Sequence, residues 1–349
     1  MTKKNYYSAN PVESNTITVK PGIRQTARHQ PVYLGIDIGG TNTKLGWVDN
    51  TGQCMQYDSF PTRADRPFSE FFKDLKTRLS KSLETYTGTY ELVGIGIGAP
   101  IANRWTGTME AASNFSWGKV PVVAMIRENF DVPVVIDNDA NAAAMGEKCF
   151  GSARTMKNFI MVTLGTGLGS GFVVNGSLLY GAHGFAGELG HIIVDWNGRQ
   201  CGCGRKGCLE TYVSASGIKR TVFELFAEKM ERSSLRSIDF ETLQAEQITV
   251  AAQRGDPIAL EAFERTGKIL GQKLADAVAF TDPEAIILGG GLSRSGKFLL
   301  TPAQHYFEQN LLNVYKGNVH LILSSLSTKD FAVLGAGALI MQEVQMRVT

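Results

Sequence analysis

The sequence predicts an α/β protein of two related lobes that face each other across a central cleft. Short apolar runs typical of strands alternate along the chain with segments of helical periodicity. A strand, a glycine-rich turn and a second strand occur twice, in "VYLGIDIGGTNTKLGWVD" and in "FIMVTLGTGLGSGFVV", so that Gly39 aligns with Gly165. The length of 349 residues is enough for two domains with a large buried core.

The first half begins with a polar stretch and continues with a glycine-tipped hairpin. Residues 1–30 contain Pro11 and Pro21 and no apolar periodicity, which predicts a flexible extension. Apolar, β-branched residues at 32–38 predict a buried strand, and "KLGWVD" predicts the strand that returns from the turn. The elements that follow are expected to be a helix, two buried strands and an alanine-rich helix, at 67–86, 91–100, 132–137 and 138–150.

The second half repeats this plan, beginning with the hairpin at 159–174. Helices are expected around 216–231 and 256–280. The apolar run "EAIILGGGLS" predicts a strand that ends in three glycines. A last strand and a last helix are expected at 319–324 and 330–344.

The composition is that of an ordinary globular protein, with 43% apolar and 19% charged residues. A net charge of +2 gives no support for a nucleic-acid or membrane surface, so neither partner is expected. The N-terminal residues lack the apolar region of a signal peptide, and no run of about eighteen apolar residues predicts a membrane span. We therefore expect a cytoplasmic protein, in which thiols stay reduced.

Three glycine-rich turns each follow an apolar strand. Glycine lets backbone N–H groups converge without obstruction by side chains, which suits a polyphosphate. One such turn is typical of any tight hairpin, but three in one chain favour a nucleotide site. None matches the Walker A pattern or the full dinucleotide fingerprint, so the nucleotide is expected on hairpins rather than at a helix N-terminus. The turns are Gly39, Gly40 and Thr41, then Gly165, Thr166 and Gly167, then Gly289, Gly290 and Gly291.

Two charged residues flank the first turn. Asp37 ends the strand, where an acid either caps the turn or holds a hydrated Mg²⁺ against phosphates. Beside a phosphate-binding turn we favour the magnesium role. Lys44 either reaches a phosphate or points along its strand as a solvated lysine.

Three motifs, "DIGGTNTK", "GELGH" and "CGCGRKGCLE", together resemble the ROK family of sugar kinases and repressors in the actin/hexokinase-like superfamily. The resemblance extends from residue 31 to the C-terminus. It implies an actin-like, ribonuclease H-like fold with a small lobe of residues 31–137 and 334–349 and a large lobe of residues 138–333. It also implies an ATP-dependent hexose kinase that binds Mg-ATP on the three turns. Asn42 stands where many relatives carry lysine, which leaves backbone binding of phosphate intact.

His191, Cys201, Cys203 and Cys208 offer one imidazole and three thiolates, a set that suits tetrahedral structural zinc. Free thiols or a disulfide are the alternatives, and both the expected reducing compartment and the tight loop argue against a disulfide. The resemblance implies zinc on these four residues. Because four protein ligands leave no open position, this zinc would fix the loop and take no part in the chemistry.

A kinase that acts on an alcohol needs a carboxylate to accept the hydroxyl proton. Asp137, Asn138 and Asp139 begin the alanine-rich helix, where such residues commonly serve only as caps. The resemblance implies that Asp139 is the catalytic base. Ile101 follows Pro100 at a position where relatives often carry glycine, so the sequence departs from the family pattern near the expected sugar contacts. The resemblance further implies that the sugar hydroxyls are bound by Asn114, Asn138, Asp139, Glu188, His191 and Glu210.

Glucose, phosphorylated on its 6-hydroxyl, is the expected substrate because "GELGH" and "GCLE" look most like the glucokinase branch of the family. N-acetylmannosamine, N-acetylglucosamine and fructose are the alternatives, and a dimer or tetramer is implied. The family's repressors carry a helix-turn-helix of roughly sixty residues ahead of the hairpin. About 30 residues precede Val32 here, so a transcriptional regulator is not expected. A non-catalytic sugar-sensing protein is the alternative of a different class, although Asp139 and all three turns argue for activity.

Overall fold

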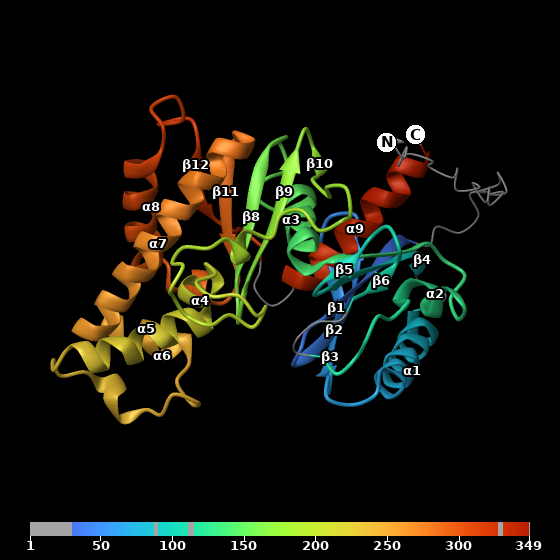
Figure 1. The fold of residues 1–349 in the computed structure, drawn as a ribbon. Helices are drawn as coiled ribbons and strands as arrows, with labels where there is room; N and C mark the ends of the chain where they lie inside the picture. Colours follow the sequence, from blue (N-terminus) through green and yellow to red (C-terminus); the bar gives the residue numbers. More distant parts are fainter. Residues whose placement is uncertain (1–29, 87–89, 111–114, 327–330, 349) are drawn as a thin grey trace, which may run out of the picture.

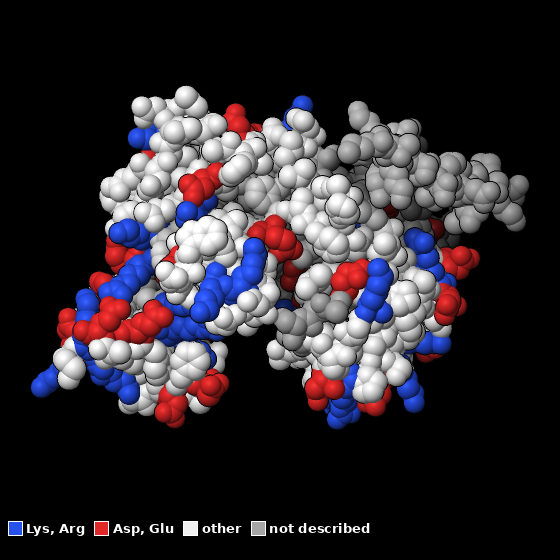
Figure 2. Space-filling model, viewed as in Figure 1, with Lys and Arg blue, Asp and Glu red and all other residues white. Residues whose placement is uncertain are grey.

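The computed structural model describes residues 30–86, 90–110, 115–326 and 331–348. Within them, two five-stranded sheets lie side by side, with helices between them and on their outer faces (Figure 1). This is the two-lobed α/β arrangement expected from the sequence. The space-filling view shows a hollow that separates the two lobes and opens at the lower edge of the molecule, with acidic side chains visible along its inner end (Figure 2).

The first sheet contains the N-terminal hairpin and has the strand order β3-β2-β1-β4-β7. Strands β1, β2 and β3 pair antiparallel, whereas β4 and β7 join β1 in parallel. The four strands expected in this region are confirmed to within two residues at each end. The strands are β1 (Gln30–Ile38), β2 (Asn42–Asp49), β3 (Cys54–Pro61), β4 (Tyr90–Ala99) and β7 (Val134–Asn138).

The second sheet has the strand order β10-β9-β8-β11-β12 and repeats the topology of the first. Strands β8, β9 and β10 pair antiparallel, and β11 and β12 join β8 in parallel. The internal repeat predicted from the two hairpins therefore extends to whole sheets. The strands are β8 (Phe159–Leu164), β9 (Leu168–Val174), β10 (Ser177–Leu178), β11 (Ala285–Gly289) and β12 (His320–Leu323).

Two helices, α3 (Asp139–Phe150) and α9 (Phe331–Val348), cross between the sheets and form the middle of the molecule (Figure 1). Helix α3 packs on the second sheet, whereas α9 packs on the first, although it ends the chain. A Cβ atom at Gly335 would lie 2.6 Å from the carbonyl of Ala142, so glycine permits the close crossing. We propose, as expected from the sequence, that the small lobe combines residues 31–137 with 334–349.

Separate apolar cores cover the outer face of each sheet. Helices α1 (Phe68–Tyr86) and α2 (Val122–Arg127) cover the first sheet, where Leu75 and Leu79 pack against β1 residues such as Leu34. Helices of the large lobe cover the second sheet. They are α4 (Glu210–Val213), α5 (Ala215–Glu228), α6 (Ala245–Gln253), α7 (Pro257–Thr281) and α8 (Lys297–Asn310).

The remaining elements are short. A two-stranded hairpin of β5 (Ala102–Asn103) and β6 (Thr108–Met109) follows β4. The described residues also contain three 3₁₀ helices, namely η1 (Leu189–His191), η2 (Ser234–Ser237) and η3 (Leu292–Ser295). Among the described residues, no helix has both the length and the apolar character needed to cross a bilayer.

Candidate functional site

The first glycine turn joins β1 to β2 and is closed by hydrogen bonds. Gly39 N–H donates to the carbonyl of Asn42 at 3.1 Å, and the Thr62 hydroxyl donates to Gly39 O at 2.6 Å. A Cβ atom at Gly39 would lie 2.8 Å from the Asn42 carbonyl, so the turn favours glycine. Gly40 and Thr41 at its tip are accessible. The turn is therefore fixed and accessible backbone, as a phosphate site requires.

Asp37 ends β1 and pairs with Lys44 of β2. The two residues are partners in the antiparallel register, and Lys44 Nζ lies 4.0 Å from Asp37 Oδ2. Lys44 thus contacts an acid as well as solvent. Burial and repulsion from Asp139 raise the pKa of Asp37 to about 7, against the influence of Lys44. A divalent cation bound beside this carboxyl would favour its ionised form.

The second and third turns lie side by side at the carboxyl ends of β8 and β11, which are parallel neighbours. Gly165 N–H donates to Gly167 O at 3.0 Å within the second turn. In the third turn Gly290 has φ +89°, and a Cβ atom there would lie 2.6 Å from the carbonyl of Leu164. Close approach of the two backbones therefore depends on glycine.

The β7–α3 junction carries Asn138 and Asp139. Asn138 is the N-cap of α3, and its side-chain oxygen accepts a hydrogen bond from Ala140 N–H at 2.8 Å. The carboxylate of Asp139 accepts from the same N–H at 2.8 Å. The capping role considered for this segment therefore belongs mainly to Asn138. Its amide NH₂ group remains available to a ligand.

Neighbouring acids affect the ionisation of Asp37 and of Glu188. The side chain of Asp139 is accessible to solvent. The protein packed around its carboxyl group still removes much of the hydration, and this desolvation raises its pKa. Burial raises the pKa of Glu188, and repulsion from Asp139 and Glu210 adds to the rise, whereas His191 lowers it. Asp37 is coupled to Asp139 in the same way. The fold thus gathers acids that are far apart in the sequence.

The segment from His191 to Cys208 brings one histidine and three free thiols together. His191 Nδ1 lies 3.8 Å from Cys201 Sγ, and Cys203 Sγ lies 3.6 Å from Cys208 Sγ. All four donor atoms lie within 4.8 Å of one another. A tetrahedral zinc with ligands at about 2.0–2.3 Å separates its donors by roughly 3.3–3.8 Å, so these residues fit the metal.

The thiols of this cluster differ in their readiness to ionise. Although burial acts to raise it, hydrogen bonding with Arg205 lowers the pKa of Cys203 to about 6. Burial and the neighbouring thiols raise the pKa of Cys208 to about 12 in the metal-free protein. Since metal binding deprotonates coordinating thiols, the cluster would release protons when it takes up a metal.

Glu210 connects the cysteine loop to the second glycine turn. One carboxylate oxygen accepts a hydrogen bond from Leu168 N–H at 2.9 Å, just after that turn. The other oxygen lies 3.8 Å from Cys201 Sγ. A Cβ atom at Gly167 would collide with the Glu210 carboxylate, so glycine is required beside it. Glu210 is therefore part of the framework as well as a candidate sugar ligand.

The structure brings several of the predicted site residues close to one another. Asp37, Asp139, Glu188 and Glu210 share one region, and His191 Nε2 lies 4.0 Å from the Glu188 carboxylate. Asn114 and residues 1–29 lie outside the described residues.

Sequence reasoning missed residues that support this region, among them Thr62 and Arg104. Thr62 locks the first turn, and its hydroxyl also lies 2.9 Å from that of Thr43. Arg104 forms an ion pair with Asp137 at 3.6 Å, and its guanidinium lies over the ring of Tyr180 at 5.4 Å. No local motif marks these residues, because their partners are brought to them by the tertiary fold.

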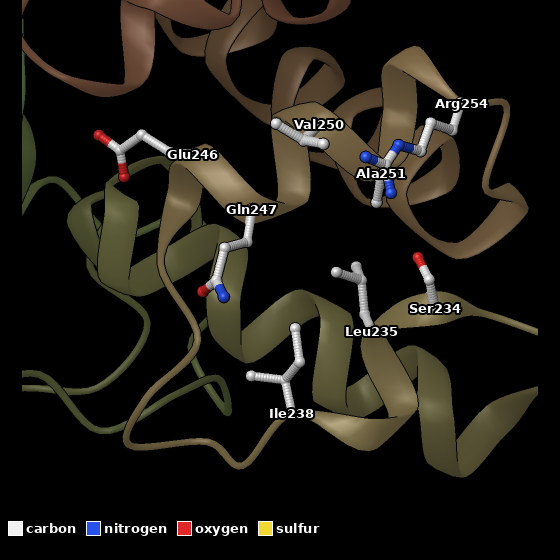
Figure 3. Close-up of a pocket in the computed structure, with 8 residues that line it drawn as sticks. All are labelled: Ser234, Leu235, Ile238, Glu246, Gln247, Val250, Ala251 and Arg254. Atoms are coloured by element: carbon white, nitrogen blue, oxygen red, sulfur yellow. The ribbon is translucent and has the colours of Figure 1, made fainter.

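A separate hollow of about 330 Å³ lies between η2 and α6 in the large lobe (Figure 3). Leu235, Ile238 and Gln247 point into the space between these two elements. None of its lining residues was singled out in the sequence. It is therefore distinct from the region of the acids and the glycine turns.

The paired sheets, the hinge-like crossing of α3 and α9 and the turns at the strand ends define a protein of the two-lobed actin-like class. The model of the ROK family matches residues 33–343, and the chain belongs to that family.

Several proteins are similar to this chain over most of its length. A glucokinase of Halalkalibacterium halodurans is 35% identical over 89% of this chain and 95% of its own length. A ROK family glucokinase of Streptomyces griseus, solved in complex with glucose and AMPPNP, is 30% identical with a TM-score of 0.76, covering 89% of this chain and 99% of its own. A ROK family transcriptional regulator, a homologue of the E. coli MLC protein, is 26% identical with a TM-score of 0.81, covering 90% and 78%.

Proposed function

We propose that the protein is an ATP-dependent glucokinase that transfers the γ-phosphate of ATP to the 6-hydroxyl of glucose. Its relatives named glucokinase are covered almost end to end, and one of them was solved with glucose and an ATP analogue. The observation that carries the proposal is the position of Asp139. Its carboxylate begins α3 within electrostatic reach of Asp37, beside the first turn, and of Glu188, beside the cysteine loop.

Asp139 is the proposed catalytic base. Its carboxylate takes the proton of the sugar 6-hydroxyl while that oxygen bonds to the γ-phosphorus. The bond between the γ-phosphorus and the oxygen bridging to the β-phosphate breaks, and ADP leaves. Desolvation raises the pKa of Asp139, which makes it a stronger proton acceptor than a fully hydrated aspartate.

The remaining side chains would hold the sugar. Asn138 would donate from its amide NH₂ group, because its oxygen caps α3. Glu188, which faces solvent in the cleft, would accept from a hydroxyl. Asn114 and the free side of the His191 ring complete the proposed wall. Glu210 would contribute from its position against the second turn.

Mg-ATP would lie on the three glycine turns, with Asp37 holding the hydrated magnesium ion. When bound, the metal would neutralise charge on the phosphates. The turns at 39–41, 165–167 and 289–291 would bind phosphate oxygens through backbone N–H groups. Lys44, whose ammonium group lies beside Asp37, would also contact a phosphate. Closure of the lobes would align the acceptor hydroxyl and exclude water.

We also propose that His191, Cys201, Cys203 and Cys208 bind a structural zinc ion. The close approach of the four donors and the lowered pKa of Cys203 support this. The metal would hold the loop that presents Glu188 and Glu210 to the sugar. It would stay outside the phosphoryl transfer, since four protein ligands fill its coordination shell.

The decisive experiment measures ADP release with Mg-ATP over glucose, mannose, fructose, N-acetylglucosamine and N-acetylmannosamine. Turnover highest with glucose and abolished in Asp139→Ala would support the proposal. Preference for another sugar of the panel would replace glucose but keep the kinase. No turnover with any sugar, in folded and zinc-loaded protein, would refute a hexose kinase.

The likeness to a ROK transcriptional regulator favours one alternative, a sugar-responsive protein without catalysis. Sugar-induced thermal stabilisation without turnover, together with specific binding to duplex DNA at physiological salt, would support it. For a glucokinase we expect no specific DNA binding, and sugar binding should be accompanied by phosphorylation.

We also propose that the protein is a homodimer or homotetramer, which light scattering after size-exclusion chromatography would test.

A further inference from the structure

A buried cluster of charges lies behind the β7–α3 junction, outside the residues assigned above. Arg104 comes from the turn between β5 and β6, and its side chain is only 12% exposed. One guanidinium nitrogen lies 3.6 Å from the carboxylate of Asp137, the penultimate residue of β7. The other forms an ion pair with Glu343 of α9. Arg104 thus joins three segments of the chain that are distant in sequence.

Asp137 fixes the start of α3. Its side chain is 2% exposed, and one carboxylate oxygen accepts hydrogen bonds from Asn138 N–H and from the Asn141 amide, both at 2.8 Å. These donors lie on either side of Asp139. The orientation of Asp139 therefore depends on the carboxylate two residues before it.

The turn that carries Arg104 also contacts the other lobe. The Asn103 amide donates to the carbonyl of His183 at 3.1 Å, and Trp105 packs edge-on against Tyr180 with ring centroids 5.1 Å apart. Tyr180 in turn lies under the Arg104 guanidinium. The residues around Arg104 therefore belong to both lobes.

We propose that Arg104 is a positioning residue for Asp139, which it holds in place through the buried carboxylate of Asp137. This inference rests on the proposed kinase function, because it assigns Arg104 to the same phosphoryl transfer. It goes beyond that function by adding a residue that touches neither sugar nor nucleotide.

A buried charge is costly when it has no partner. Removal of one member of a buried ion pair leaves the other in a medium that disfavours it, so the surroundings rearrange. Arg104 and Tyr180 line a cavity of about 610 Å³ that Asp137 does not line, so a shorter side chain at 104 would open Asp137 to water. A displacement of about 1 Å at a catalytic group can cost roughly 100-fold in rate.

The test compares Arg104→Gln, Asp137→Asn and the double variant with wild type, using glucose and Mg-ATP. Arg104→Gln should lower kcat at least about tenfold and raise the KM for glucose, because Asn138 and Asp139 move together. The KM for ATP should stay within about twofold, since the glycine turns lie elsewhere. The double variant should be no worse than Arg104→Gln, because both substitutions remove the same ion pair between Arg104 and Asp137.

Two further variants keep the test decisive if Arg104→Gln folds poorly. Arg104→Lys keeps the charge opposite Asp137 but loses the forked geometry, so its kcat should lie between those of wild type and Arg104→Gln. Arg78→Gln removes an arginine that pairs with Asp58 at 2.7 Å on the outer side of the small lobe, and should leave kcat unchanged. Unfolding curves for every variant give the folded fraction.

Three results would overturn the proposal. They are a wild-type kcat in folded Arg104→Gln, losses that multiply in the double variant, and a fall in activity that merely follows the folded fraction with both KM values unchanged. Wild-type turnover is measured in the same assay. If wild type itself phosphorylates no hexose, the kinase function fails; if wild type is active and Arg104→Gln equals it, only the role of Arg104 fails.

Discussion

Four carboxylates in one cleft repel one another, and each is held by a different partner. Asp37 faces Lys44, Asp139 accepts from a backbone N–H at the start of α3, and Glu210 accepts from the Leu168 N–H. Glu188 lies near the His191 ring. Because the partners differ, substitutions at these acids should have separable effects.

Replacement of the proposed base should abolish chemistry and spare the fold. Asp139→Asn keeps the shape and the hydrogen bond to Ala140 N–H but cannot take a proton. We expect kcat for glucose phosphorylation to fall about 10²–10⁴-fold, with a melting temperature close to that of wild type. Steady-state kinetics and thermal unfolding measure the two quantities. A kcat within tenfold of wild type would exclude Asp139 as the base.

Asp37 should make the metal-free protein less stable as pH rises. The fold raises the pKa of this carboxyl to about 7 from the roughly 3.9 of an unfolded aspartate. The neutral form is favoured in the fold, so its stabilising contribution is complete below about pH 4 and lost as pH rises through about 7.

The variant Asp37→Asn cannot ionise and should reveal this dependence. Without Mg-ATP, its melting temperature relative to wild type should increase steadily from pH 4 to pH 8. With saturating Mg-ATP at pH 8 the order should reverse, because wild type gains the bound metal. A pH-independent difference between the two proteins would contradict the buried, protonated state of Asp37.

At the scale of elements, the two glycines of the second turn have different expected roles, one in packing and the other in ligand binding. A Cβ atom at Gly167 would collide with Glu210, whereas one at Gly165 meets no protein atom within 4 Å. Gly167→Ala should therefore lower the melting temperature of the ligand-free protein by several degrees, and Gly165→Ala should not. Gly165→Ala should instead raise the KM for ATP, because its methyl group obstructs the phosphate. Equal melting temperatures for the two variants would refute this account.

The cysteine loop should depend on its metal. We expect about one zinc per chain by elemental analysis, and removal by a chelator should lower the melting temperature and weaken glucose binding. Added Zn²⁺ should restore both. Cys203→Ser should lose the metal, whereas Cys54→Ser, the same change outside the loop, should retain it. Full glucose affinity in zinc-free protein would refute a role for the metal in the sugar wall.

The elements that the sequence revealed are those with a strong local pattern. The two hairpins, helix 67–86 and the long helix α7 were evident from apolar periodicity, and α7 begins with Asp256 as N-cap and Pro257 in its first turn. Strand β3 was missed because "CMQYDSFP" has no apolar run. Helix α8 was missed although it is 14 residues long, and it carries Pro302 in its interior.

At the scale of the molecule, one helix crossing connects the two lobes. Helices α3 and α9 carry Asp139 and Glu343, so movement of one lobe against the other involves both the proposed base and the ion pair of Arg104 with Glu343. We expect glucose to reduce the radius of gyration in small-angle X-ray scattering by closing the hollow. Asp139→Asn at saturating glucose should close as well, since closure needs binding and not chemistry. An unchanged radius in both proteins would argue against lobe closure.

The candidate site was predictable only where its residues lie in motifs. The turns and the cysteine cluster each occupy a short segment, so residue type and spacing pointed to them, whereas the proposed role of Asp139 came from the resemblance to the ROK family. Arg104 and Thr62 could not be found in this way, because their partners are 33 and 23 residues away along the chain and meet them only after folding. Sequence patterns therefore reveal groups that contact ligands more readily than the groups that support them.

Glu210 has a consequence for how the two ends of the site affect each other. A single carboxylate contacts both the thiol cluster and the backbone that follows the second turn. Any coupling free energy between two sites acts equally in both directions. If occupancy of the thiols by metal tightens nucleotide binding, bound nucleotide must tighten metal binding by the same free energy. An enzyme working in ample ATP would then hold its zinc more firmly than a starved one.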